Sequence, residues 1–325
     1  MNKNIKIFLN YFLGPLLFIV LSWSLYKQII HRPDLPQRWM QIKLSWKNGY
    51  FWIVFFLMFV NWGLEARKWQ LLVAPLEKFS FFKAFKSVLS GCSVTMLTPN
   101  RIGEYGGRIV YVKEEHRISA IPLTILGSIS QLSVTVIMGT IGLIVFRYLE
   151  ADAALFKILP AFAANILLYI SVVSSVVLIL IYLRVRLIIR LINSISFFKK
   201  INKYLQLLNS FNRKQLLRIL FLSFLRYMVF ILQYLLLLKV MQVEISNYVC
   251  FWLLSVFYLV MAMAPTIGFT ELPVRAAASV ELLQLYSSNI IGIQAASLGI
   301  WLINLALPAI AGSLLIFGIK IMKEK

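Results

Sequence analysis

The sequence predicts an all-α integral membrane protein with an inverted internal repeat, and three observations lead to this fold class. Hydrophobic residues make up 60% of the 325 residues and charged residues only 14%, with a mean hydropathy of +0.82. Long apolar stretches alternate with short basic segments. Two regions far apart in the chain share one Pro/Gly-containing pattern. A soluble domain of this length does not carry so much apolar sequence, so we expect a single membrane domain over residues 1–325.

Six apolar stretches are long enough to cross a bilayer as full helical spans. An apolar core about 30 Å thick requires roughly 20 helical residues. The six stretches cover approximately residues 8–30, 50–67, 119–148, 158–182, 219–239 and 290–319. The second is the shortest of the six and is borderline in length.

Two further apolar regions are shorter and end in polar breaks. Residues 83–97 lead into a break with Pro99 and Gly103, and residues 248–264 lead into a break with Pro265 and Gly268. Proline removes a backbone donor, so such a break at membrane depth persists only where protein or a wet cavity satisfies the freed groups. We expect each region to form two half-helices that meet at a polar elbow. The pattern fits a re-entrant pair or two full crossings.

The two broken regions indicate an internal repeat. Aligning Glu104 with Glu271 places Arg108 on Arg275 without a gap, and these are the only two Glu-x-x-x-Arg pairs in the sequence. The repeat units cover about 1–150 and about 158–319, with three full spans each. An odd number of crossings requires the second unit to enter the membrane inverted. Inverted repeats with broken helices that meet near the midplane are typical of transporters.

The distribution of charge predicts the orientation. The net charge is +21, and residues 183–218 carry many cations interleaved with apolar residues and no acidic residue. Because Lys and Arg collect in cytoplasmic loops, this segment is expected to be a cytoplasmic amphipathic stretch lying on the lipid headgroups. Both termini are then cytoplasmic, in a bacterial-type plasma (inner) membrane. The loop 27–47 does not follow this rule, because it is basic although the count of spans places it on the outer side.

The paired charges suggest a site for an anion. Ionisable groups inside a bilayer are costly and are usually paired or functional. We expect Arg101, Arg108 and Arg275 to offer forked donors to a phosphate, with Glu104 and Glu271 holding the guanidinium groups when the site is empty. The alternative is that the pairs only neutralise each other and hold the elbows. Other polar residues within spans either line this cavity or form interhelical hydrogen bonds: Asn61, Glu65, Gln131, Gln233 and Asn304.

Several classes of site are not indicated. The sequence has no nucleophile elbow, P-loop or dinucleotide-binding motif, so we assign no catalytic residue and no cofactor. His31 and His116 lack partner ligands, and no metal site is expected. No segment between the apolar runs is long enough to present a basic soluble face to nucleic acid.

At the breaks the sequence resembles the lysylphosphatidylglycerol synthase transmembrane family, which is flippase-like. The first motif of that family is similar to the segment 98–104 followed by Arg108, and the second is similar to the segment 265–278, which contains Arg275. Two positions differ: Ala276 stands where the family usually has glutamate, and Trp301 where an arginine is common. The soluble synthase domain of fused members has no counterpart here, so we expect a stand-alone member that does not make an aminoacyl lipid.

The resemblance implies translocation of an anionic lipid or lipid-linked intermediate, bound between the two broken helix pairs. One alternative is an intramembrane transferase acting on a polyprenyl-phosphate or a phospholipid. Another is a non-catalytic membrane partner of a separately encoded lipid or glycan synthase.

Overall fold

The chain folds into a bundle of helices. The computed structural model describes residues 36, 40, 43–96, 98, 103–149, 161–193, 203–263 and 271–317, and every regular element in this part of the chain is a helix. Five helices are long and apolar enough to cross a membrane. They are α4 (Gly49–Val73), α7 (Arg117–Tyr148), α9 (Ala161–Leu183), α12 (Arg213–Val240) and a continuous rod of α15 (Ile290–Trp301), the π-helical η5 (Leu302–Ala306) and α16 (Leu307–Phe317). The protein is therefore a multi-pass membrane protein, as predicted.

Five of the six predicted spans correspond to these helices, with ends that differ by several residues. The first predicted span, residues 8–30, lies outside the described residues. Helix α4 continues past Arg67 to Val73, and α12 begins at Arg213, before the predicted start at residue 219. In the added part of α4, Lys68 Nζ lies 2.8 Å from Glu65 Oε2, one turn earlier on the same helix, so its charge is neutralised inside the protein.

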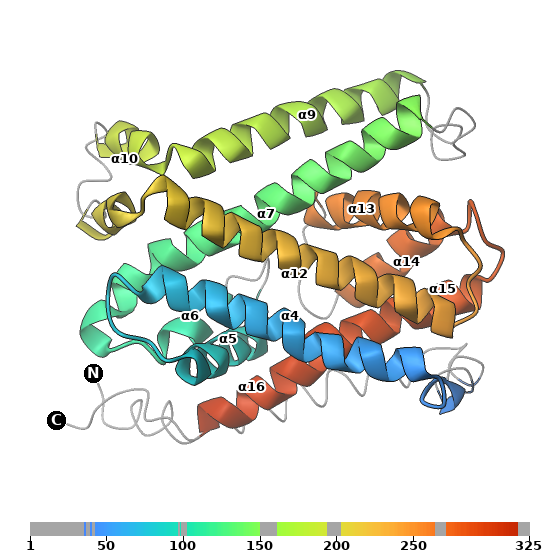
Figure 1. Cartoon of the computed structure of the whole chain (residues 1–325), viewed down its shortest axis with the longest axis horizontal. Helices are drawn as coiled ribbons and strands as arrows, with labels where there is room; N and C mark the ends of the chain where they lie inside the picture. The colour runs from blue at the N-terminus through green and yellow to red at the C-terminus, as the bar shows by residue number, and fades with distance from the viewer. Residues whose placement is uncertain are drawn as a thin grey trace.

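Each broken region forms two helices, α5 (Phe81–Thr95) with α6 (Gly103–Ile109), and α13 (Asn247–Met263) with α14 (Glu271–Leu283). In Figure 1 the first pair lies at the left end of the bundle, where α4 ends and α7 begins, and the second pair lies at the right end. The chain enters and leaves each pair at the same end of the bundle (Figure 1), which holds for a re-entrant hairpin and for two full crossings alike. The helices of the pairs have 15, 7, 17 and 13 residues, fewer than the roughly 20 that a full crossing requires. Their lengths therefore favour re-entrant hairpins. The elbow residues Pro99, Arg101, Pro265 and Gly268 lie outside the described residues.

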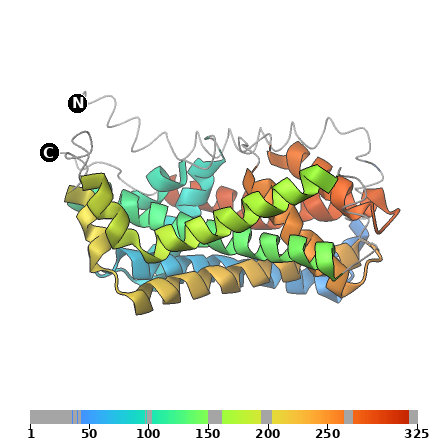
Figure 2. The same ribbon diagram turned by 90° about the horizontal axis from the view of Figure 1, so that it is seen from above.

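The helices of the two halves pair in corresponding ways. Helices α4 and α12 lie side by side and run in opposite directions (Figure 1). Helix α5 packs on α16 in the same way that α13 packs on α7. Figure 2, turned by 90°, shows the long helices running lengthwise along the bundle, with α9 inclined to the others. These pairings agree with the predicted inverted repeat, which stays a prediction.

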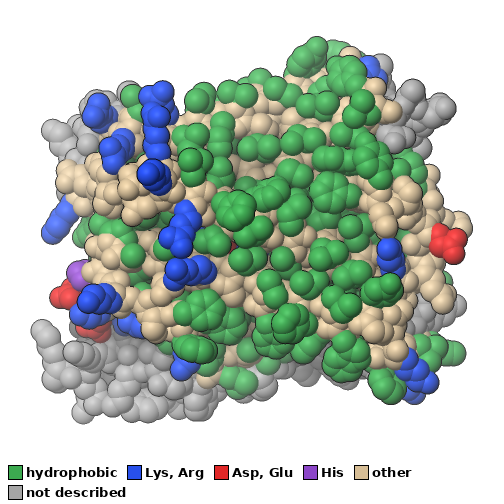
Figure 3. Space-filling model, in the orientation of Figure 1, with side chains coloured by type: hydrophobic (Ala, Val, Ile, Leu, Met, Phe, Trp, Pro, Cys, Tyr) green, Lys and Arg blue, Asp and Glu red, His purple; other side chains and the backbone are tan. Residues whose placement is uncertain are grey.

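Cations gather at one end of the bundle. Figure 3 shows Lys and Arg side chains concentrated at the left end, around α10 (Val185–Asn193) and the start of α12. The predicted basic segment 183–218 comprises α10, the 3-10 helix η4 (Gln206–Ser210) and the first turns of α12, with residues 194–202 outside the described part. A capping box between Asn212 and Gln215 starts α12 there. A further 3-10 turn, η2 (Glu114–His116), precedes α7 at the same end.

Gly312 allows α16 to pack closely against α5 of the first hairpin. A Cβ at Gly312 would overlap the backbone carbonyl of Leu89 and come within 3.0 Å of the Ser90 amide nitrogen. Small residues let membrane helices approach closely, and backbone atoms cannot move aside as a side chain can.

We expect Gly312→Ala to destabilise the protein by about 1–3 kcal/mol, the usual effect of overpacking. Thermal unfolding of the purified protein in detergent measures this loss. Gly63→Ala is the matched control, because its Cβ would meet only Phe81 Cζ, at 3.9 Å. Equal melting temperatures for the two variants would show that α16 and α5 do not pack closely at Gly312.

Candidate functional site

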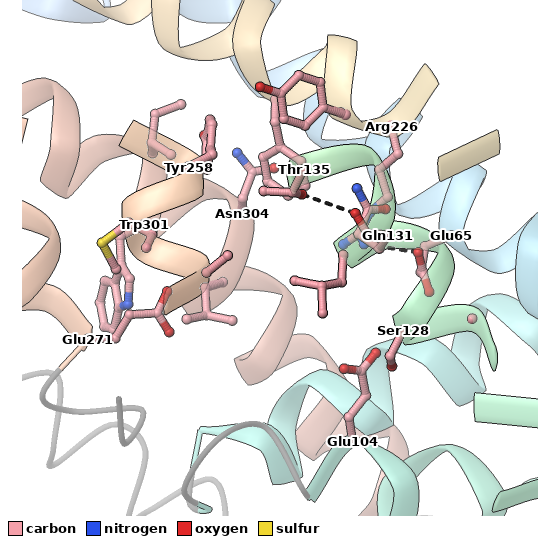
Figure 4. A pocket seen from close by; sticks show the side chains of 18 of the residues that line it. Glu65, Glu104, Ser128, Gln131, Thr135, Arg226, Tyr258, Glu271, Trp301 and Asn304 are labelled. Atoms are coloured by element: carbon pink, nitrogen blue, oxygen red, sulfur yellow. Dashed lines mark hydrogen bonds and ion pairs between the residues drawn. The ribbon is translucent and has the colours of Figure 1, made fainter. Parts of the chain in front are cut away.

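A cavity of about 570 Å³ lies at the centre of the bundle. Its walls come from both hairpins and from four of the long helices (Figure 4). The residues that line it fall near the middle of each long helix: Trp62 to Lys68 in α4, Gly127 to Thr135 in α7, Arg226 to Phe230 in α12 and Ile300 to Leu305 in α15 and η5. Because these helices are the membrane spans, the cavity lies at about half the depth of the bilayer.

Glu65 is the centre of a buried charge cluster beside the cavity. Its carboxylate lies 2.8 Å from Lys68 Nζ, 2.6 Å from an Arg108 terminal nitrogen and 2.9 Å from Arg226 Nη1. The Glu65 side chain is 3% exposed. One carboxylate therefore holds three cations that arrive from three different helices.

The first hairpin contributes a carboxylate to the cavity and a guanidinium behind it. Glu104 lines the cavity and is paired with Arg108, which is 2% exposed. The Arg108 guanidinium also stacks over the Trp69 ring, 5.5 Å from its centroid. Gly91 of α5 leaves room for this side chain, since a Cβ there would lie 2.7 Å from Arg108 Cγ.

The second hairpin contributes the corresponding pair, and here both members line the cavity. Arg275 donates to Glu271 over 2.8 Å and lies 5.7 Å from the centroid of Phe257. Both charged residues are buried. Glu271 lies beside Trp301 on one side of the cavity, and Glu104 lies beside Ser128 on the other (Figure 4).

A chain of hydrogen bonds joins the two halves across the cavity. Arg226 Nε donates to Asn61 Oδ1 over 2.8 Å, and Asn61 Nδ2 donates to Asn304 Oδ1 over 2.8 Å. The Arg226 guanidinium is also stacked between Trp62 and Phe230, at 5.3 and 5.2 Å. The position of Arg226 is thus determined by both charge and ring contacts.

The cluster around the cavity carries a net positive charge. Among the described residues it contains four cations, Lys68, Arg108, Arg226 and Arg275, and three carboxylates, Glu65, Glu104 and Glu271, so the sum is +1. An uncompensated buried charge is unfavourable, and an anion entering the cavity would balance it.

The structure brings together most of the predicted site residues that it describes. Glu104, Glu271 and Arg275 line one cavity, whereas Arg108 lies behind Glu104 and meets no open space. Gly103 is buried at the start of α6, where a Cβ would overlap the Val94 carbonyl, so the first elbow requires glycine there. The other predicted elbow residues and Arg101 are outside the described part.

Sequence reasoning missed three residues of the site, Lys68, Arg226 and Trp62. An arginine in the middle of an apolar span was a signal for Arg226, since such residues are rarely without a role. The i, i+3 spacing of Glu65 and Lys68 was a signal for the pair. Of the polar residues left open above, Gln131 and Asn304 line the cavity, while Gln233 donates to the Val54 carbonyl as an interhelical hydrogen bond.

The chain was compared with known families and proteins. Residues 11–312 match the family described as Lysylphosphatidylglycerol synthase TM region, which is nearly the whole chain. No curated protein and no solved structure matches it. A match of this extent confirms the resemblance of the two break motifs, and the chain therefore belongs to the lysylphosphatidylglycerol synthase transmembrane-region family.

Proposed function

We propose that this protein is a flippase or transporter that moves an anionic lipid, or a lipid-linked anion, across the membrane. The observation that carries the proposal is the central cavity, which is lined by charged residues of both re-entrant hairpins. The family description connects the chain with membrane lipid chemistry, since lysylphosphatidylglycerol is a lipid.

The position and charge of the cavity support a lipid headgroup as the cargo. A headgroup crossing the bilayer needs polar contacts at half depth, where lipid tails offer none. The cavity supplies them there, and its net positive charge favours an anion over a cation. Arg275 is the guanidinium of the predicted site that lines the cavity, and Glu271 holds it in position.

The pairing of the two halves supports an alternating mechanism. If the halves form an inverted repeat, each hairpin opens toward one leaflet and the same site is reached in turn from both. The concentration of cations at the end with α10 (Figure 3) supports a cytoplasmic location for that end, in keeping with the orientation proposed from the sequence. Since the sequence has no nucleotide-binding motif, exchange is expected to be energy-independent or driven by a gradient.

The double variant Glu271→Gln with Arg275→Gln tests this function. It removes the ion pair without leaving one buried charge unpaired, so the fold is expected to be retained. We expect movement of phosphatidylglycerol between leaflets to fall by about tenfold or more, because a bond to a charged group contributes 1.5–3 kcal/mol. A leaflet-specific assay on proteoliposomes measures the rate.

Glu77→Gln with Lys83→Gln is the matched control, since it removes an ion pair of the same length, 2.8 Å, that does not line the cavity. Undiminished movement in the Glu271/Arg275 variant would rule out this site. Mass spectrometry of the lipids after the assay separates transport, which leaves the lipid unchanged, from an intramembrane transferase, which makes a new product.

A further inference from the structure

Three neutral N–H groups at the cavity have no hydrogen-bond partner among the described residues. They are Trp62 Nε1, Trp301 Nε1 and Asn304 Nδ2. These side chains line the cavity, and the residues are only 7%, 1% and 5% exposed. A buried donor without a partner costs about 1–3 kcal/mol, so such groups are rarely left in place without a reason.

The hydrogen-bond chain forces Asn304 to present a donor. A guanidinium has no acceptor, so Asn61 must turn its Oδ1 to Arg226 and its Nδ2 away from it. That Nδ2 group then requires an acceptor, which is Asn304 Oδ1. The Asn304 amide group is left with Nδ2 as its remaining polar atom. Arg226 therefore sets the orientation of the Asn304 amide. It does so through Asn61, which belongs to the first half of the chain, whereas Arg226 and Asn304 both belong to the second half.

The three donors can serve one ligand. Trp301 and Asn304 both line the cavity, and Asn304 lies between Trp301 and Arg226 in the view of Figure 4. Trp62 follows Asn61 on α4, and the Arg226 guanidinium lies 5.3 Å from the centroid of its ring. Among the neutral lining groups, Gln131 Oε1 and the hydroxyl groups of Tyr227 and Tyr258 also lack a hydrogen-bond partner. The amide oxygen can only accept, whereas the hydroxyl groups can donate or accept, so the cavity offers three N–H groups and two hydroxyl groups as neutral donors.

We infer that Asn304, Trp301 and Trp62 form a neutral subsite that binds the oxygens of a phosphate group. This inference rests on the proposed function and assigns the recognition step within it. The guanidinium groups around the cavity are bonded to carboxylates through terminal nitrogens and supply the positive field, and Arg275 Nε, which has no hydrogen-bond partner among the described residues, can add a charged donor. The neutral N–H groups supply further direct hydrogen bonds. A phosphodiester headgroup and free phosphate share this chemistry.

The experiment measures binding to the purified protein in detergent with three probes. Dihexanoyl phosphatidylglycerol carries the phosphodiester, dihexanoylglycerol has the same tails without phosphate, and inorganic phosphate has no tails. Asn304→Asp keeps the bond from Asn61 but replaces the donor by a carboxylate. Trp301→Phe removes one N–H group and keeps a ring.

We expect each variant to bind the phosphodiester at least about tenfold more weakly than the wild type, the effect of losing one bond to a charged group. Binding of dihexanoylglycerol is expected to be unchanged. Trp252→Phe and Asn247→Asp are the matched controls, because neither residue lines the cavity. Melting temperatures within about 2 °C of the wild type confirm folding, and either variant alone is sufficient if the other fails to fold.

The outcomes separate the subsite from the proposed function. If the wild type moves lipid and both variants bind the phosphodiester as it does, the subsite is wrong and the transport function stands. If both variants lose binding while the wild type moves no lipid, the subsite stands and the transport function is wrong. Absence of phosphodiester binding to the wild type overturns the subsite. If inorganic phosphate binds as tightly as dihexanoyl phosphatidylglycerol, the phosphate group alone is recognised. If dihexanoyl phosphatidylglycerol binds and inorganic phosphate does not, the tails are needed as well.

Discussion

Replacement of Glu65 by glutamine is expected to have the largest effect of any single substitution on the stability of this protein. The Glu65 carboxylate is bonded to Lys68, Arg108 and Arg226. After its removal Arg108 keeps its pair with Glu104, and Lys68 and Arg226 lose the carboxylate that both contact. Breaking one buried pair typically costs 3–5 kcal/mol, because the remaining charge is left uncompensated. We expect the midpoint of thermal unfolding to fall by roughly 5–10 °C.

The control for this prediction is Glu281→Gln, since Glu281 is an exposed carboxylate on α14. A double variant, Glu65→Gln with Lys68→Met, removes one cation as well and is expected to recover part of the loss. Both are compared with the wild type by thermal unfolding in detergent. If Glu65→Gln melts within about 1 °C of the wild type, the carboxylate does not hold the cluster together.

Replacement of Arg226 by lysine is expected to have the largest effect on transport relative to its effect on folding. Lysine keeps the positive charge near Glu65 but cannot also donate through a fixed guanidinium to Asn61. The amides of Asn61 and Asn304 then lose the bond that orients them. We expect lipid movement in proteoliposomes to fall by about tenfold, with only a small change in melting temperature.

Arg218→Lys is the control, because Arg218 lies on the same helix, two turns earlier, and is exposed. This substitution is expected to leave the transport rate unchanged. A transport rate for Arg226→Lys equal to that of Arg218→Lys would mean that only the charge at position 226 matters. The oriented hydrogen-bond chain would then have no part in transport.

The spans and the hairpins could be predicted because their signals are local. A run of about 20 apolar residues is stable in a bilayer only as a spanning helix. A Pro/Gly break within such a run is stable only where protein or a wet cavity satisfies the freed backbone groups. The ends of the spans were predicted less closely: α4 continues past Arg67 to Val73, and the charge of Lys68 in that part is paired with Glu65 inside the bundle. The sequence pattern fits a re-entrant pair and two full crossings equally, and only the observed lengths of α5, α6, α13 and α14 favour the re-entrant pair.

The sequence alone determined that this is a multi-pass helical membrane protein of one family, and that Glu104, Glu271 and Arg275 belong together, because two identical charge spacings follow two breaks. Only the tertiary structure decided that Glu65 is the centre of the charge cluster and that Arg226 and Asn304 face the same cavity. Glu65 and Arg226 are 2.9 Å apart in space but belong to different helices of the two halves. Which polar groups of a membrane protein find each other depends on helix packing, and packing is a property of the whole bundle.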